Sequence, residues 1–206
     1  ELGEFQPVAL DALRQPLEEG VVRVSRARAT VEFPARFLLV AAMNPCPCGA
    51  PGGPGSCRCS DRARARYHRR VSGPLLDRFD LRIEVHRPAT SELLGGPPGE
   101  PSAAVAARVE RVRELARLRG APTNALLPST ALDEHAALAP DAVAVVERAM
   151  RDGRLSARGY NRIRAVARTL ADLEGHEGPL REPHVLAALE LRSSLRVFSG
   201  EVADAS

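Results

Sequence analysis

All four cysteines of the chain lie within residues 46–59, as two Cys-x-Cys pairs. Cys46 and Cys48 are separated from Cys57 and Cys59 by residues 49–56 (GAPGGPGS), which allow the chain to turn back on itself. Four thiolates arranged in this way suit one tetrahedral Zn²⁺, although two residues between paired ligands is the commoner spacing. Redox catalysis would need a base, and His68 is the local candidate. Structural zinc, unliganded structural cysteines and redox chemistry are therefore all open, whereas a disulfide disagrees with a reducing cytosol.

A polar residue stands at the end of an apolar run just before the cysteines. Residues 36–43 (RFLLVAAM) are typical of a strand buried on both faces of a parallel sheet, and Asn44 follows them. Ligands of open α/β sheets bind at the carboxyl ends of the strands. Asn44 is therefore a candidate binding residue, or a turn-former ahead of Pro45.

Two arginines have positions from which they could stabilise charge on a phosphoryl group. Arg78 lies in SGPLLDRFDL between Asp77 and Asp80, so it either contacts a phosphoryl group or belongs to a surface salt-bridge cluster. Arg158 occupies the first turn of a predicted helix, where the helix dipole disfavours a positive charge. It therefore either serves a ligand or is simply solvated.

A third group of arginines lies in residues 20–33, where apolar and polar residues alternate with a period of two. This alternation predicts a β-hairpin whose tip carries Arg23, Arg26 and Arg28. The three arginines could contact nucleic-acid phosphates, although a solvated polar turn explains them equally well. Aromatic side chains for stacking on single strands are missing from the tip.

The elements that must position these residues divide the chain into two parts. Apolar spacing predicts a helix over 7–19. Residues 61–70 are predicted to form a polar, arginine-rich helix, and residues 81–85 a second short strand. A Gly- and Pro-rich stretch from residue 87 to 101 predicts a linker. Beyond it, helices are predicted over 103–119, over 140–150, after an N-cap at Ser156 and after Pro183. A parallel sheet needs more than two strands, so the others are expected before residue 1.

Composition narrows the class of protein further. The chain has 206 residues, is 44% hydrophobic and carries a net charge of +3, as expected for one or two globular domains. All 29 basic residues are arginine, which excludes lysine-dependent chemistry. No membrane-length apolar run, signal peptide or initiator Met is present, so we expect a cytoplasmic protein without a membrane partner, and a fragment of a longer chain.

Several long motifs resemble one known family. Six segments look like successive motifs of the magnesium-chelatase-like AAA+ ATPases of the ComM/YifB type. In chain order they are ELGEF, RQPLEEGVVRVSRA, FPARFLLVAAMNPCPCG, CRC, SGPLLDRFDL and SARGYNRIRAVARTLADL. The similarity runs from residue 1 to about residue 195. It implies an α/β fold in which residues 1–89 are the C-terminal half of a P-loop (AAA+) core. A linker over 90–102 and an all-α lid domain over 103–206 would follow.

The resemblance also implies roles for single residues in ATP hydrolysis. Glu1 would be the last acid of the Walker B motif, and Asn44 would be sensor 1; both act on the attacking water. Arg78 would be the arginine finger that acts in trans on ATP held by a neighbouring subunit. Arg158 would be the sensor 2 arginine of the lid. Residues 20–33 would be the pre-sensor-1 hairpin, which faces the pore of a ring.

The chain departs from the family pattern in one essential respect. It contains no G-x-x-x-x-G-K-[ST] loop, and the acid that holds Mg²⁺ would precede Glu1. We therefore expect the cofactors ATP and Mg²⁺ to be bound by the full-length parent, and weakly or not at all by this chain. The resemblance implies two kinds of partner: identical subunits, which would form a hexameric ring, and DNA. The alternative function is a non-catalytic, zinc-stabilised nucleic-acid-binding module.

Overall fold

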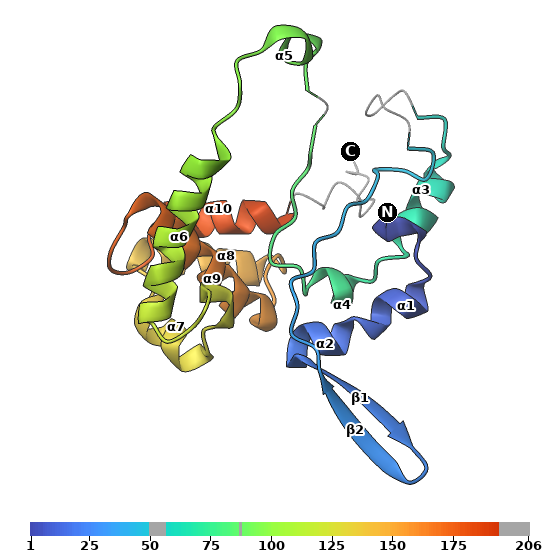
Figure 1. Cartoon of the computed structure of the whole chain (residues 1–206), viewed down its shortest axis with the longest axis horizontal. Helices are drawn as coiled ribbons and strands as arrows, with labels where there is room; N and C mark the ends of the chain where they lie inside the picture. The colour runs from blue at the N-terminus through green and yellow to red at the C-terminus, as the bar shows by residue number, and fades with distance from the viewer. Residues whose placement is uncertain (50–56, 87, 194–206) are drawn as a thin grey trace. The chain divides into compact units, whose positions relative to one another are not determined.

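The structure is a computed structural model that describes residues 1–49, 57–86 and 88–193 (Figure 1). The Gly/Pro insert between the cysteine pairs therefore lies outside the described residues from residue 50 to 56, as does the chain beyond residue 193. The described residues form two compact units. The first comprises Glu1–Phe79, and the second begins at Asp80 and continues through the helices that follow.

The first unit begins with short helices that pack on a small apolar cluster. A 3-10 turn, η1 (Leu2–Glu4), precedes α1 (Pro7–Ala12) and α2 (Arg14–Glu19). The single helix predicted over 7–19 is thus divided at Leu13, because Pro16 has no N–H to continue the hydrogen-bond ladder. Leu10 is buried together with Val71 and Leu75 from later in the unit. α2 ends at Gly20, whose left-handed conformation (φ +69°) suits glycine.

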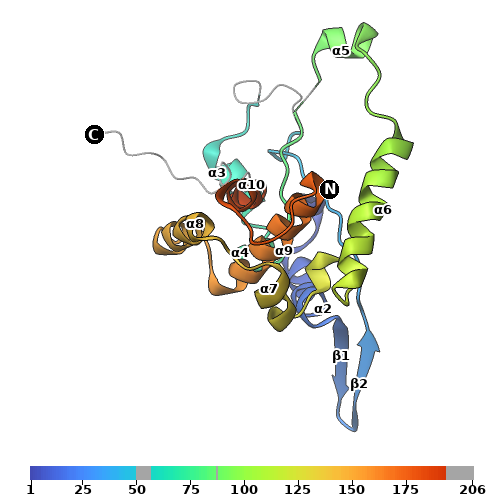
Figure 2. The same cartoon turned by 90° about the vertical axis from the view of Figure 1, so that its left-hand side faces the viewer.

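The predicted hairpin is confirmed and consists of β1 (Val21–Arg26) and β2 (Ala29–Pro34), paired antiparallel. It projects away from α1 and α2 of its own unit (Figures 1 and 2). Its base is closed by a hydrogen bond from the Ala35 N–H to the Gly20 carbonyl at 2.8 Å. The register pairs Arg23 with Glu32 on one face. The other face carries valine and phenylalanine side chains that are 38–52% exposed: Val22, Val24, Val31 and Phe33.

Two capped helices complete the first unit. α3 (Asp61–His68) begins at Ser60, whose hydroxyl accepts a hydrogen bond from the Ala63 N–H. α4 (Gly73–Leu76) begins at Ser72, which accepts from the Leu75 N–H and donates to the Asp11 carboxylate at 2.7 Å. Ser72 therefore fixes the SGPLLDRFDL segment to α1, and with it the position of the residues that follow α4.

The two strands predicted over 36–43 and 81–85 are wrong for this chain. Both segments lack regular secondary structure, and β1 and β2 form the only sheet in the described ranges. Apolar side chains of both segments are strongly exposed, with Leu38 at 87% and Val85 at 89%. A strand forms only where a neighbouring strand takes up its N–H and C=O groups, and the described residues supply no such neighbour. The α/β part of the predicted fold is therefore incomplete in this chain.

The second unit is helical, as predicted. After α5 (Thr90–Gly95), in the segment predicted as a linker, come α6 (Ser102–Leu118), η2 (Asn124–Leu126), α7 (Ser129–His135), α8 (Pro140–Arg151), α9 (Ala157–Glu174) and α10 (Glu182–Ser193). α9 packs against α6, α7 and α10 (Figure 1). Its apolar stripe includes Ile163 and Ala167, both fully buried in the core of this unit. None of the described helices is long and apolar enough to cross a lipid bilayer.

A charged network is buried beside this core. The Asp172 carboxylate on α9 accepts two hydrogen bonds from Arg119, at 2.5 and 2.7 Å. It also accepts one each from Asn124, at 2.8 Å, and Arg168, at 2.9 Å. The Arg168 guanidinium donates in addition to the carbonyls of His176 and Gly178. Every one of these contacts lies within the helical unit, so the network ties α9 to the segments on either side of it.

Candidate functional site

The backbone segments that carry Glu1 and Asn44 lie side by side in the first unit. The Leu2 N–H donates a hydrogen bond to the Ala42 carbonyl at 2.7 Å, across forty residues of sequence. Both Glu1 and Asn44 have exposed side chains. The acid and the amide therefore lie next to hydrogen-bonded backbone, and both are exposed to solvent.

Tyr67 on α3 contacts both of these segments. Only 3% of Tyr67 is exposed, and its ring occupies the space in which a side chain at Gly3 would lie. The Asn44 N–H donates to the Tyr67 hydroxyl oxygen. Burial and the charge of Glu4 raise the Tyr67 pKa, and the hydrogen bond from Asn44 partly opposes the shift. Tyr67 is not among the residues predicted from the sequence, although a lone tyrosine in an arginine-rich helix is a signal that could identify it.

Two neighbours of Tyr67 bind the same segments. The Arg70 guanidinium donates to the Gly3 carbonyl at 2.6 Å and also reaches the Glu4 carboxylate at 3.4 Å. The His68 ring donates to the Pro45 carbonyl. Burial lowers the His68 pKa, and this hydrogen bond partly offsets the effect. His68 therefore anchors the backbone at Pro45.

Arg78 is held within its own unit. Its guanidinium donates to the Arg14 carbonyl at 2.9 Å and to the Pro74 carbonyl at 2.6 Å, and it forms an ion pair with Glu18. Its side chain is only 8% exposed. Of the two sequence interpretations of Arg78, the salt-bridge one has an acidic partner here, Glu18 on α2, which the sequence interpretation did not name.

Arg158 belongs to the helical unit and is exposed in the first turn of α9. Ser156 caps this helix by accepting a hydrogen bond from the Gly159 N–H at 3.0 Å, as predicted. One turn further on, Arg162 forms an ion pair with Asp80 at 2.7 Å. The structure thus brings Glu1, Asn44 and Arg78 into one unit and places Arg158 in the other.

The three hairpin arginines differ in their surroundings. The Arg23 guanidinium donates to Glu32 at 2.6 Å and also pairs with Glu19, and the hydrogen bond to Glu32 contributes most to raising its pKa. Arg26 and Arg28 are exposed at the tip. Arg23 therefore stiffens the base of the hairpin, whereas Arg26 and Arg28 are presented to solvent.

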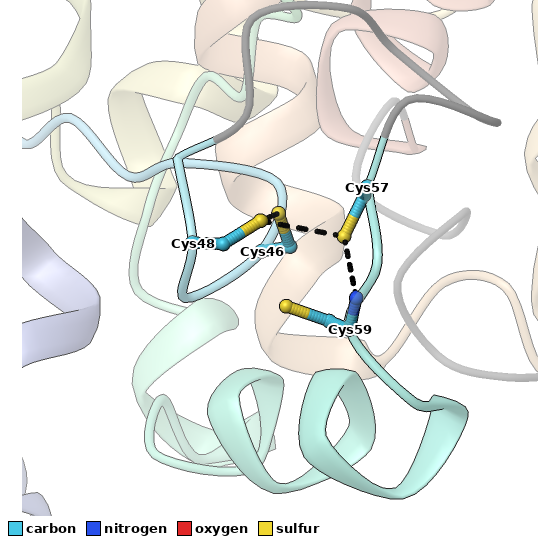
Figure 3. A group of neighbouring side chains, drawn as sticks. All are labelled: Cys46, Cys48, Cys57 and Cys59. Atoms are coloured by element: carbon cyan, nitrogen blue, oxygen red, sulfur yellow. Dashed lines mark hydrogen bonds between the residues drawn. The ribbon is translucent and has the colours of Figure 1, made fainter.

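The four cysteine thiols come together as the spacing predicted. Figure 3 shows the sulfur atoms of Cys46 and Cys48 facing those of Cys57 and Cys59 across the gap between two chain segments. All four Sγ atoms lie within 4.8 Å of one another. The Cys46 and Cys48 Sγ atoms are 3.1 Å apart, and those of Cys48 and Cys57 are 3.5 Å apart.

Such spacings fit thiolates arranged around one ion, because a tetrahedral zinc site with Zn–S bonds of about 2.3 Å holds its sulfurs just under 4 Å apart. The Cys59 N–H donates to the Cys57 Sγ at 3.3 Å, and the Arg64 guanidinium also interacts with that thiol. Both contacts place N–H donors beside the Cys57 sulfur. The cluster therefore has the donor set, the spacing and the positive surroundings of a zinc site.

Comparison with known proteins assigns nearly the whole chain to two family profiles. Residues 1–93 match the profile of magnesium chelatase, subunit ChlI, and residues 99–192 match that of the ChlI C-terminal region. The chain is 46% identical to the competence protein ComM of Haemophilus influenzae and 40% identical to the YifB protein of Escherichia coli. Each alignment covers 96% of this chain but 39% of the relative. The chain thus spans about two fifths of the length of these relatives.

Proposed function

Because the chain belongs to the magnesium-chelatase-like family of the ComM/YifB type, we propose that it is the C-terminal part of a ring-forming AAA+ ATPase. In this proposal, subunits of the full-length protein assemble as a hexamer and couple hydrolysis of ATP with Mg²⁺ to work on DNA, as a helicase or in branch migration during recombination. A relative named as a competence protein supports the DNA-related role. The protein would act in the cytoplasm.

The observation that carries the proposal is the pairing of the Glu1 and Asn44 segments through Leu2 and Ala42. Hydrolysis of a phosphoanhydride needs a positioned water molecule and stabilisation of the charge that develops on the transferred group. Glu1 would activate or orient the water, and Asn44 would hold it close to the γ-phosphate. Neither residue can grip the β- and γ-phosphates, so the lysine loop would come from the residues upstream of Glu1.

That upstream region would also complete the sheet. The extended segments at 36–43 and 81–85 expose apolar side chains, and the relatives are long enough to contain the remaining strands. With partners on both sides, these segments would become the buried strands that their composition indicates. The proposed domains are then a core over 1–89, a linker over 90–102 and a lid from 103 onward.

Arg78 and Arg158 would act on the nucleotide from different directions. Arg78 would be the arginine finger of one subunit, directed to ATP held by the next. Its side chain is now 8% exposed, so its contacts with Glu18 and two carbonyls would have to be released when a neighbour docks. Arg158 would contact the phosphates from the lid, because the first turn of α9 exposes its guanidinium.

Arg26 and Arg28 would contact DNA phosphates from the tip of the hairpin. Arg23 would contribute indirectly, since its two carboxylate partners already neutralise it. The cysteine cluster would hold one structural Zn²⁺, which supplies cross-linking of the loop and takes no part in hydrolysis.

Two measurements test the proposal. Calorimetric titration of this chain with ATP and Mg²⁺ is expected to show no binding at micromolar concentration, whereas a chain extended upstream of Glu1 binds and hydrolyses ATP. Micromolar ATP binding by the present chain alone would overturn the proposal that the residues upstream of Glu1 are needed to bind the nucleotide. Tight DNA binding by the present chain, with no ATPase activity in the extended one, would support the zinc-stabilised nucleic-acid-binding module instead.

A further inference from the structure

The cysteine cluster lies close along the chain to Asn44 and to α3, the helix that contacts the Glu1 and Asn44 segments. We propose that α3 is a metal-dependent clasp: the cysteine cluster fixes its start, its end holds Gly3 and Asn44 in place, and Tyr67 is the positioning residue. This inference rests on the proposed ATPase function for its effect on turnover. Its structural part stands independently of that function.

First, residues of α3 and the turn after it contact both the segment that carries Glu1 and the segment that carries Asn44. Tyr67 lies against Gly3 and accepts the Asn44 N–H, and Arg70 binds the Gly3 carbonyl. His68 adds the Pro45 carbonyl. Together with the Leu2–Ala42 hydrogen bond, these contacts fix the backbone on which Glu1 and Asn44 are carried. A side chain on fixed backbone is held closer to one orientation, and a misplaced catalytic group loses much of its effect.

The second step is the closeness of the cysteine cluster to these contacts along the chain. Pro45, which His68 binds, directly precedes Cys46, and Cys59 directly precedes Ser60, the N-cap of α3. Arg64, one turn into α3, interacts with the Cys57 thiol. The cluster therefore joins the residues just after Asn44 to the residues just before α3. A metal there would tie the backbone just after Asn44 to the start of α3 through the four described thiols.

The third step concerns charge. Four thiolates around a divalent ion carry a net charge of minus two, and Arg64 lies beside one of them. Without the ion, the two cysteine pairs are no longer joined, and the start of α3 loses its anchor. Loss of metal thus loosens the contact of Tyr67 with Asn44 without touching any group that binds ATP. The expected functional effect is on kcat, with KM unchanged.

The structural test uses the present chain with Zn²⁺ or with Co²⁺ as a spectroscopic probe. We expect one equivalent of metal per chain and the thiolate-to-cobalt charge-transfer bands of a tetrahedral site. Hydrogen exchange of the Asn44 amide should slow about tenfold when Zn²⁺ is added. Tyr67→Phe, which keeps the ring on Gly3 but loses the hydroxyl, should abolish this protection while still binding metal. Tyr160→Phe in the helical unit is the matched control and should behave as wild type.

The functional test uses the chain extended upstream of Glu1. Tyr67→Phe should lower kcat about two- to tenfold with KM unchanged, and Cys57→Ser with Cys59→Ser should do the same while reducing metal content. Metal binding that leaves Asn44 exchange equally slow in wild type and Tyr67→Phe would overturn the clasp, and so would failure to bind Zn²⁺ or Co²⁺. Absence of ATP turnover in the extended wild-type chain would refute the proposed function instead, because the exchange experiment does not depend on it.

Discussion

Replacing Asp172 by Asn should destabilise the helical unit strongly. The Asp172 side chain is 1% exposed and accepts four hydrogen bonds, three of them from the guanidinium groups of Arg119 and Arg168. The substitution keeps the volume but leaves these two cations without their shared counter-charge, with Arg168 itself only 4% exposed. Removal of one partner from a buried ion pair costs about 3–5 kcal/mol, a large part of the stability of a domain this size.

Urea unfolding followed by far-UV circular dichroism measures this loss. The transition of the helical unit should move to much lower urea in Asp172→Asn. Glu110→Gln is the matched control, because Glu110 pairs with Arg117 on the exposed surface of α6 and its loss should leave the midpoint unchanged. A midpoint for Asp172→Asn as close to wild type as that of the control would refute the argument that the network stabilises this unit.

The same carboxylate predicts a dependence on pH. Burial alone would raise the Asp172 pKa, but the hydrogen bonds from Arg119 and Asn124 and the charges of both arginines outweigh it and leave the pKa below its ordinary value. A carboxyl whose folded pKa is depressed contributes stability that is complete above the unfolded pKa, about 3.9, and that disappears as pH falls through the folded value. Wild type should therefore lose stability below about pH 4 more steeply than Asp172→Asn.

Three further predictions concern the proposed ATPase and its metal. In the extended chain, Arg78→Ala should lower ATP turnover about a thousandfold or more while ATP binding measured by calorimetry persists; equal loss of both would argue against a finger. Joint replacement of Arg26 and Arg28 by Ala should reduce the slope of log affinity for duplex DNA against log salt by about two, whereas Arg23→Gln should change it little. Chelation of bound metal should lower the thermal midpoint of the first unit and leave that of the helical unit unchanged, and equal shifts in both would contradict a local site.

The sequence alone determined those features whose signals are local. The hairpin follows from a two-residue period and a short turn, and the start of α9 follows from a Ser156 N-cap, because the groups that satisfy each pattern lie within a few residues. The cysteine cluster could also be predicted from the sequence, because its two Cys-x-Cys pairs are separated by only a short segment of chain. The family resemblance rests on long contiguous motifs of the same kind.

The tertiary structure decided what depends on residues far apart in the chain. Residues 36–43 read as a buried strand, yet remain exposed here because a strand needs partners that the described residues do not provide. Glu18 as the partner of Arg78 could not be found from spacing, since sixty residues separate them. Tyr67 gave no periodic signal; its importance comes from Gly3 and Asn44, which only folding brings to its ring and hydroxyl. Residues close in sequence therefore determine the helices, the hairpin and their caps. Contacts between distant residues depend on which surfaces become buried together when the whole chain folds.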